Sequence, residues 1–193
     1  MHVLVAAALT EEVAHLGGDV EVVVTGVGKA RAAAALGRRL AASPPDLVVN
    51  VGTAGAVDSS LRGVVEIDFV TQHDFPYDAV ETLLGAPLDR GFALHRDRPP
   101  AAMRRPPPGA TAIATGDLFV ADAAAAARIA AAGIHLVDME AYGYAAACAE
   151  FGVPLWCVKA VSDAADEEAG ESWLDAIDGC ARLLAAWVQT NLR

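Results

Sequence analysis

The sequence is poor in cysteine and in basic residues and has no long apolar run, and each shortage excludes a class of protein. No window approaches the roughly 20 consecutive apolar residues that a membrane-spanning helix needs, so we expect no membrane partner. The first residues have no basic region, and they reach Glu11 and Glu12 too early for a secretory signal peptide. These features predict a cytoplasmic protein.

Basic residues are also outnumbered, with 14 Lys+Arg against 25 Asp+Glu and a formal net charge of -11. A polyanionic backbone would be repelled by most of such a surface, so we expect no nucleic-acid partner. The three cysteines, Cys148, Cys157 and Cys180, show no CxxC spacing, and the histidines are scattered singly. The pattern predicts reduced, buried thiols and no metal site.

Apolar runs of strand length alternate with longer alanine-rich stretches of helical period. The predicted strands are His2–Ala8, Val20–Thr25, Leu47–Gly52, Val65–Thr71, Thr111–Thr115, Ile134–Val137 and Leu155–Val161. The predicted helices are Glu11–Leu16, Lys29–Ala41, Asp122–Ala132, Ala141–Phe151 and Ser172–Leu192. This alternation indicates an α/β fold, and we expect one domain over 1–193 with a mixed central β-sheet flanked by helices.

The segment from Pro76 to Pro108 breaks the alternation, because it holds seven of the ten prolines and a cluster of arginines at 96, 98, 104 and 105. We expect a long surface excursion here. A functional or mobile loop and a merely tolerated insertion fit the pattern equally well.

Two glycine motifs resemble cofactor-binding turns but lack the residues that such turns need. Gly26-Val27-Gly28 opens a helix, yet Arg31 holds the third glycine position, and no acidic residue ends the next strand to bind a ribose. Gly28-Lys29 lacks the upstream glycine and the Ser or Thr of a phosphate-binding loop. We therefore expect no cofactor. The turn suits an anion or a close backbone approach, or is simply a tight strand-to-helix turn.

Three carboxylates, Glu12, Glu140 and Asp163, follow different predicted strands. Ligands of such sheets bind beyond the strand ends, so we expect these side chains to lie together. Each alone could cap a helix or stabilise its first turn, but together they suit a neutral, polyhydroxylated ligand and acid–base chemistry. Phe119 and Trp173 could stack on a heterocycle or could belong to the core.

Six segments in order complete the pattern: TEEV, TGVGKARAAAAL, VNVGTAGAVD, ATGDLFV, VDMEAYGYAAACAEFGVP and VKAVSDAAD. They resemble the nucleoside phosphorylase/nucleosidase superfamily, and within it the 5′-methylthioadenosine/S-adenosylhomocysteine nucleosidases. The resemblance covers residues 8 to about 175. It implies a three-layer sandwich, hydrolysis of the N-glycosidic bond of a purine nucleoside, a small-molecule nucleoside as partner, and a homodimer.

The resemblance also implies residue roles. Asp163 would be the general acid that protonates the purine N7, oriented by Ser162, and Glu12 would be the general base that activates water. The substrate would be bound through Glu140 at the ribose hydroxyls, Met139 under the sugar, Phe119 and Val120 at the base, Thr53 near the acid, and Trp173 closing the pocket. Thr53 and Trp173 replace the serine and phenylalanine that are usual in the family.

Phosphorylases share this scaffold but hold phosphate with arginines, and Asn50 stands where one of them is expected. Hydrolysis is therefore the preferred prediction. A phosphate-dependent phosphorylase, a futalosine or aminofutalosine hydrolase, and a non-catalytic nucleoside-binding protein are the alternatives. The futalosine hydrolases tend to carry asparagine in place of Asp163.

The chain is also shorter than the family pattern, with only Gly17–Asp19 between the first predicted helix and the strand before Gly26. The stretch after His73-Asp74, from which the family builds its 5′ pocket and part of its dimer contact, is altered and rich in proline. The 5′ substituent of the substrate is left open.

Overall fold

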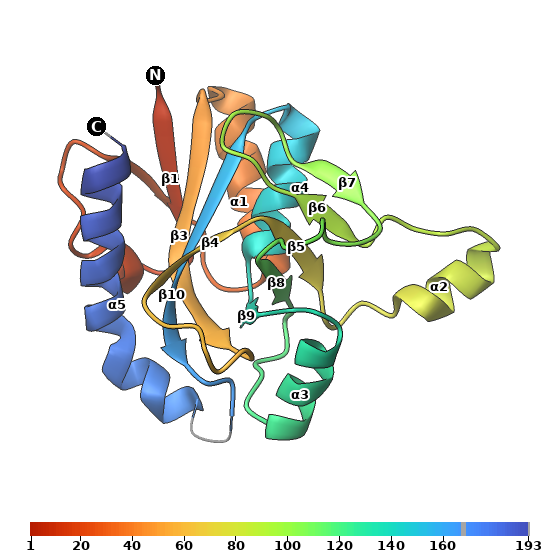
Figure 1. Cartoon of the computed structure of the whole chain (residues 1–193). Helices are drawn as coiled ribbons and strands as arrows, with labels where there is room; N and C mark the ends of the chain where they lie inside the picture. The colour runs from red at the N-terminus through yellow and green to blue at the C-terminus, as the bar shows by residue number, and fades with distance from the viewer. Residues whose placement is uncertain (167–168, 193) are drawn as a thin grey trace.

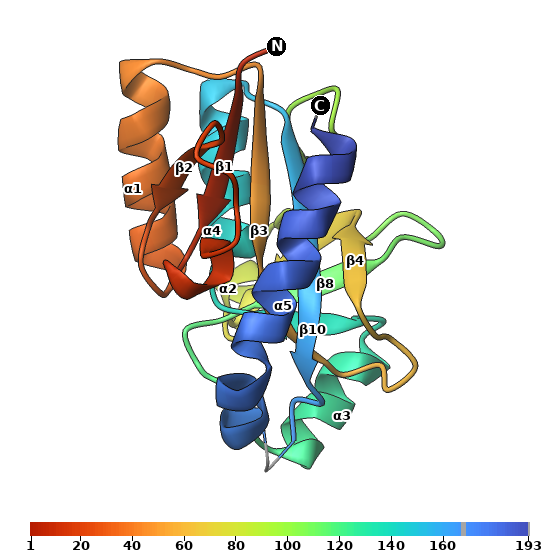
Figure 2. The same ribbon diagram turned by 90° about the vertical axis from the view of Figure 1, so that its left-hand side faces the viewer.

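A computed structural model describes residues 1–166 and 169–192 of the chain. A mixed sheet lies between two helical layers (Figures 1 and 2). One face is covered by α5 (Ala169–Asn191) and the other by α1 (Lys29–Ala42) and α4 (Ala141–Phe151), while α3 (Ala123–Ala131) lies at one end of the sheet. This is the expected α/β architecture.

The described strands form one sheet that branches at β3 (Leu47–Ala56). β3 pairs in parallel with β1 (Val3–Ala7) and β10 (Leu155–Asp163), and its last residues pair antiparallel with β9 (Leu136–Asp138). The remaining strands are β2 (Glu21–Val24), β4 (Val64–Ile67), β5 (Phe69–Gln72), β6 (Gly91–Ala93), β7 (Ala101–Met103) and β8 (Ala112–Thr115). The central strands are continuous apolar runs because helices cover both of their faces.

Two apolar cores hold the layers together, one on each face of the sheet. On the α1 and α4 side the core contains Leu36, Leu136 and Tyr144, all fully buried. Gly143 allows α4 to approach α1 closely, since a Cβ atom there would lie 2.5 Å from the carbonyl oxygen of Lys29. On the other face the apolar side of α5 packs on β3 and β10, as its sequence pattern predicts.

Two predicted elements differ from the structure. The single strand expected over Val65–Thr71 is two strands, because the chain turns at Asp68: β4 pairs with β10, and β5 pairs with β8. The helix expected over Glu11–Leu16 is a short 3-10 turn, η1 (Glu11–Val13).

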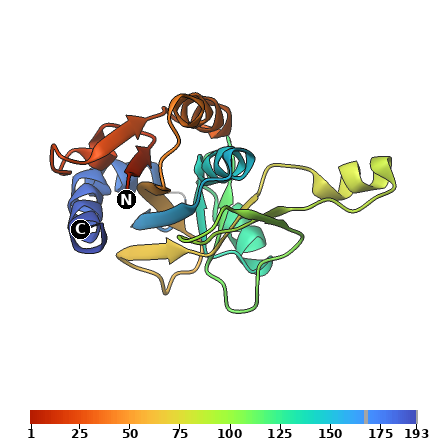
Figure 3. The same ribbon diagram turned by 90° about the horizontal axis from the view of Figure 1, so that it is seen from above.

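The proline-rich segment is more regular than expected. It contains α2 (Tyr77–Leu84), and β6 and β7 extend the sheet beyond β5. α2 projects away from the body of the molecule (Figures 1 and 3). The arginine cluster is dispersed: Arg96 stacks on Trp156, with 5.4 Å from Cζ to the ring centre, whereas Arg104 pairs with Glu81.

All three cysteines are buried and free of disulfide bonds, in agreement with the sequence. No helix within the described residues has the length and apolar character required to cross a membrane.

Candidate active site

The C-terminal ends of β1, β3, β9 and β10 surround a cavity of about 240 Å³. Every site residue expected from the sequence lines this one cavity: Glu12, Thr53, Phe119, Val120, Met139, Glu140, Ser162, Asp163 and Trp173. The roles of these residues remain predictions, but the structure brings together segments that lie up to about 160 residues apart in the chain. A cavity of this size suits a small molecule.

Glu12 is fixed by hydrogen bonds to both of its carboxylate oxygens. The backbone N–H groups of Ala8 and Leu9 each donate to Oε2 at 3.1 Å. Thr53 donates to Oε1 from its backbone nitrogen at 2.8 Å and from its hydroxyl at 3.1 Å. Trp173 in turn donates its indole N–H to the Thr53 hydroxyl at 3.0 Å. A carboxylate with this many donors is held in one orientation.

Asp163 is positioned by an irregularity at the end of β10. The register with β3 shifts between Val161 and Asp163, a β-bulge that re-aims the side chain. The hydroxyl of Ser162 donates to Oδ2 of Asp163 at 2.7 Å, and the backbone N–H of Ala165 donates to Oδ1 at 2.9 Å. Gly55 makes room for this carboxylate, because a Cβ atom there would lie 2.7 Å from Oδ1.

Glu140 lies at the start of α4, yet it does not cap that helix through its side chain. Its Oε1 instead accepts a hydrogen bond from the backbone N–H of Gly28 at 2.9 Å. The side chain is buried, and burial, followed by the nearby charge of Asp138, raises the pKa of Glu140 to about 7. At the turn that contains Gly28, the backbone therefore approaches the carboxylate of Glu140 closely.

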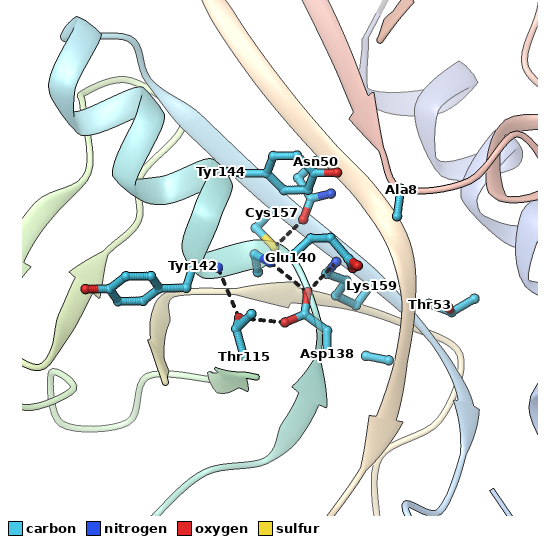
Figure 4. A network of polar contacts seen from close by, with 12 residues as sticks. Ala8, Asn50, Thr53, Thr115, Asp138, Glu140, Tyr142, Tyr144, Cys157 and Lys159 are labelled. Atoms are coloured by element: carbon cyan, nitrogen blue, oxygen red, sulfur yellow. Dashed lines mark hydrogen bonds and ion pairs between the residues drawn. The ribbon is translucent and has the colours of Figure 1, made fainter. Parts of the chain in front are cut away.

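A buried ion pair lies next to Glu140 (Figure 4). The ammonium group of Lys159 lies 2.9 Å from Oδ2 of Asp138, and both side chains are almost fully shielded from solvent. Burial alone lowers the pKa of Lys159, but the carboxylate of Asp138 together with the other acidic groups nearby outweighs burial, and the pKa lies above its ordinary value. Asp138 also accepts from the hydroxyl of Thr115 at 2.6 Å. Lys159 is therefore a structural ion-pair partner inside the sheet.

The other walls of the cavity are apolar. Phe119 and Val120 follow β8, Met139 precedes Glu140, and Phe119 is half exposed at the rim. Its ring is a free aromatic face on which a flat heterocycle can stack.

Asn50 is buried inside β3, and its side chain makes hydrogen bonds within the sheet. Its amide nitrogen donates to the carbonyl oxygens of Ala6 at 3.1 Å and Val51 at 3.2 Å, and its amide oxygen accepts from the thiol of Cys157. Among the described residues that line the cavity there is no lysine, arginine or histidine.

The described part of the chain also contains no group of three potential metal ligands. The site thus combines carboxylates with apolar walls, which suits a neutral ligand with hydroxyl groups.

Several contributors were missed at the sequence level. Leu9, Val27, Leu118 and Asp138 also line the cavity, and each lies in or next to one of the motifs quoted above. Gly52 gives space to two charged groups, since a Cβ atom there would lie 3.0 Å from Oε1 of Glu12 and 3.2 Å from Nζ of Lys159. The spacing Gly52-x-x-Gly55 on an otherwise apolar strand is the signal that could have found these contacts.

Comparison with known proteins finds similar sequences and similar structures among one group of proteins. Residues 7–192 match the family model described as the phosphorylase superfamily. The 5′-methylthioadenosine/S-adenosylhomocysteine nucleosidase of Actinobacillus succinogenes is 34% identical over 170 residues, covering 81% of this chain and 73% of the relative. The corresponding nucleosidase of Marinomonas sp. is 28% identical over 189 residues, covering 92% and 82%. A mutant of Helicobacter pylori MTAN, solved with 5′-methylthioadenosine in the active site, shares the fold with a TM-score of 0.82 at 20% identity, covering 98% of this chain and 96% of that one.

Proposed function

The chain belongs to the phosphorylase superfamily and, within it, to the 5′-methylthioadenosine/S-adenosylhomocysteine nucleosidases, and from this we propose that it hydrolyses the N-glycosidic bond of 5′-substituted adenosines. The observation that carries the proposal is the convergence of Glu12, Glu140 and Asp163 on one small cavity with apolar walls. The reaction takes a nucleoside and water to free adenine and the 5′-substituted ribose.

The leaving purine must be neutralised as its bond to the sugar breaks. We assign this step to Asp163, whose carboxyl group gives a proton to N7 while the electron pair of the C1′–N9 bond moves into the purine. The hydrogen bonds from Ser162 and the backbone of Ala165 hold the carboxyl group in place for this transfer.

The sugar left behind carries positive charge at C1′ and is attacked by water. We assign Glu12 as the base that orients this water and takes its proton, so that one proton leaves Asp163 and one arrives on Glu12 in each turnover. The four hydrogen bonds to Glu12 from Ala8, Leu9 and Thr53 support this assignment, because they hold the carboxylate in one orientation.

Binding is assigned to the remaining residues of the cavity. Glu140 binds the ribose hydroxyls and Met139 lies under the sugar. Phe119 stacks on the base, the backbone of Val120 contacts the edge of the base, and Trp173 closes the pocket while fixing Thr53. The raised pKa of Glu140 fits this role, because its charge is only partly compensated until a ligand supplies hydroxyl donors.

Hydrolysis is favoured over phosphorolysis by the charges of the site. Phosphate needs cationic partners, and the described lining of the cavity contains none. Asn50 is committed to hydrogen bonds within the sheet.

We further propose that the enzyme is a cytoplasmic homodimer whose reaction serves methionine salvage. The homodimer is supported by α2, which projects from the body and exposes the apolar side chains of Leu83 and Leu84 (Figure 1).

Replacement of Asp163 by asparagine tests the proposed chemistry. Asp163→Asn keeps the shape of the side chain but has no acidic proton, so we expect turnover of 5′-methylthioadenosine to fall at least about 100-fold. Circular dichroism and direct titration with the nucleoside should show that the fold and binding are retained. Turnover equal to that of the unaltered protein would contradict the assignment.

A further inference from the structure

Three segments of the chain meet beside the cavity in a closed ring of polar contacts. The backbone N–H of Lys29 donates to Oδ1 of Asp117 at 2.9 Å, and the backbone N–H of Asp117 donates to Oδ2 of Asp74 at 2.8 Å. The ammonium group of Lys29 closes the ring on Oδ1 of Asp74, and it also donates to Gln72 at 3.0 Å. The ring thus ties together the start of α1, the end of β5 and the end of β8.

The ion pair of the ring is mostly shielded from solvent, since the side chains of Lys29 and Asp74 are 18% and 13% exposed, whereas Asp117 is exposed. Burial on its own raises the pKa of Asp74, but the hydrogen bonds from Lys29 and from the backbone of Asp117, together with the nearby charges of Lys29 and His73, outweigh it, so the pKa lies below the ordinary value. Asp74 is therefore charged at neutral pH, and the ring holds a true ion pair.

The local backbone is built to allow this arrangement. Gly28 has a φ of 102°, and a Cβ atom there would lie 3.2 Å from Oδ1 of Asp117. A Cβ atom on Gly116 would lie 2.2 Å from the ring of His73. The segments can approach this closely only because both positions are glycine.

Lys29, Asp74 and Asp117 do not line the cavity, but the chain next to Lys29 and next to Asp117 continues into the cavity walls. Next to Lys29, the backbone N–H of Gly28 holds Glu140 at 2.9 Å. Beyond Asp117, Leu118 and Phe119 form the opposite wall. The ring therefore determines how far the aromatic wall lies from the carboxylate at the other side.

We propose that Lys29, Asp74 and Asp117 are positioning residues that hold Phe119 and Glu140 at the separation a nucleoside requires. The inference rests on the proposed function, in which Phe119 contacts the base and Glu140 contacts the ribose. Loosening the ring weakens binding of the nucleoside more than it slows the chemical step, because Asp163 and Glu12 are fixed by separate contacts.

Lys29→Met tests the proposal, because methionine keeps the length of the side chain and removes its charge. We expect KM for 5′-methylthioadenosine to rise about tenfold with kcat within about threefold of the unaltered enzyme, and Lys29→Arg to recover part of the loss. Asp74→Asn should also raise KM. The variant that carries both substitutions should show a smaller rise in KM than the two single rises combined, because both break the same ion pair.

Arg39→Met is the matched control, since Arg39 lies near the other end of α1 and pairs with Glu21 away from the cavity. It should leave KM unchanged. An unchanged KM in both Lys29→Met and Asp74→Asn, or an equal effect of Arg39→Met, would overturn the proposal.

The dissociation constant of 5′-methylthioadenosine is measured as well, because it reports on the ring without turnover. If the unaltered protein binds this nucleoside without releasing adenine, the proposed function fails, and a weaker binding by Lys29→Met still supports the ring.

Discussion

Glu12 and Glu140, two of the carboxylates that line the cavity, differ in how their charge is compensated. Within the described residues, Glu12 accepts hydrogen bonds from Ala8, Leu9 and Thr53, whereas Glu140 accepts one, from Gly28. A buried carboxylate with one donor loses more hydration than it regains. The free enzyme therefore holds Glu140 at a cost in stability that a bound ribose offsets.

Glu140→Gln should accordingly stabilise the ligand-free protein at alkaline pH. Because the pKa of Glu140 is raised from 4.5 to about 7 on folding, its charge costs nothing below pH 4.5 and destabilises the fold progressively up to about pH 7. The variant should unfold at a higher urea concentration than the unaltered protein at pH 8, by up to a few kcal/mol, and the difference should shrink toward pH 4.5.

Glu150→Gln provides the control for this comparison, because Glu150 is exposed on the same helix, α4. It should change stability little at either pH. A Glu140→Gln variant that is less stable than the unaltered protein at pH 8 would show that the charge is better compensated than the structure implies.

The sequence predicted which side chains line the cavity because strand-end positions and motif order carry that information. It could not predict how they are supported. The roles of Gly52 and Gly55 depend on which side chains cross β3, and the ring of Lys29, Asp74 and Asp117 depends on contacts between segments far apart in sequence. Such contacts are a property of the folded chain.

At the scale of elements, the buried strands and the long helices were predictable from their apolar patterns. The predicted elements differ from the structure where the partner with which a strand pairs decides its bounds. The strand expected over Val65–Thr71 is divided because its two halves pair with different strands, β10 and β8. β6 and β7 are only three residues each and form because β5 offers an edge, so their own sequence carries little signal.

The projecting helix α2 is the element on which the proposed homodimer depends. Leu83 is 85% exposed and Leu84 is 61% exposed, although both are apolar. We expect the double substitution of Leu83 and Leu84 by serine to weaken self-association about 100-fold or more, since two leucines would lose their buried contacts. Analytical ultracentrifugation over a range of concentrations measures the change.

Leu183→Ser is a suitable control, because Leu183 is an exposed leucine on α5, far from α2 in the fold (Figure 3). It should leave the mass in solution unchanged. A protein that is monomeric before any substitution, or a dimer that α2 does not affect, would contradict the proposed assembly.

At the scale of the whole molecule, the net charge and the lining of the cavity both disfavour the binding of phosphate. A net charge of -11 opposes the approach of phosphate, and the described lining of the cavity offers no cation to hold it. The same negative field has little effect on a neutral nucleoside such as 5′-methylthioadenosine. That the chain is one domain over 1–193 stays a prediction, although the family match extends over nearly all of it.

The most direct measurement is the incubation of purified protein with 5′-methylthioadenosine, with and without phosphate, followed by identification of both products. We predict adenine and free methylthioribose at a rate that does not depend on phosphate. Release of adenine that requires phosphate and yields a sugar phosphate would contradict the hydrolase, and tight binding without any product would contradict catalysis itself.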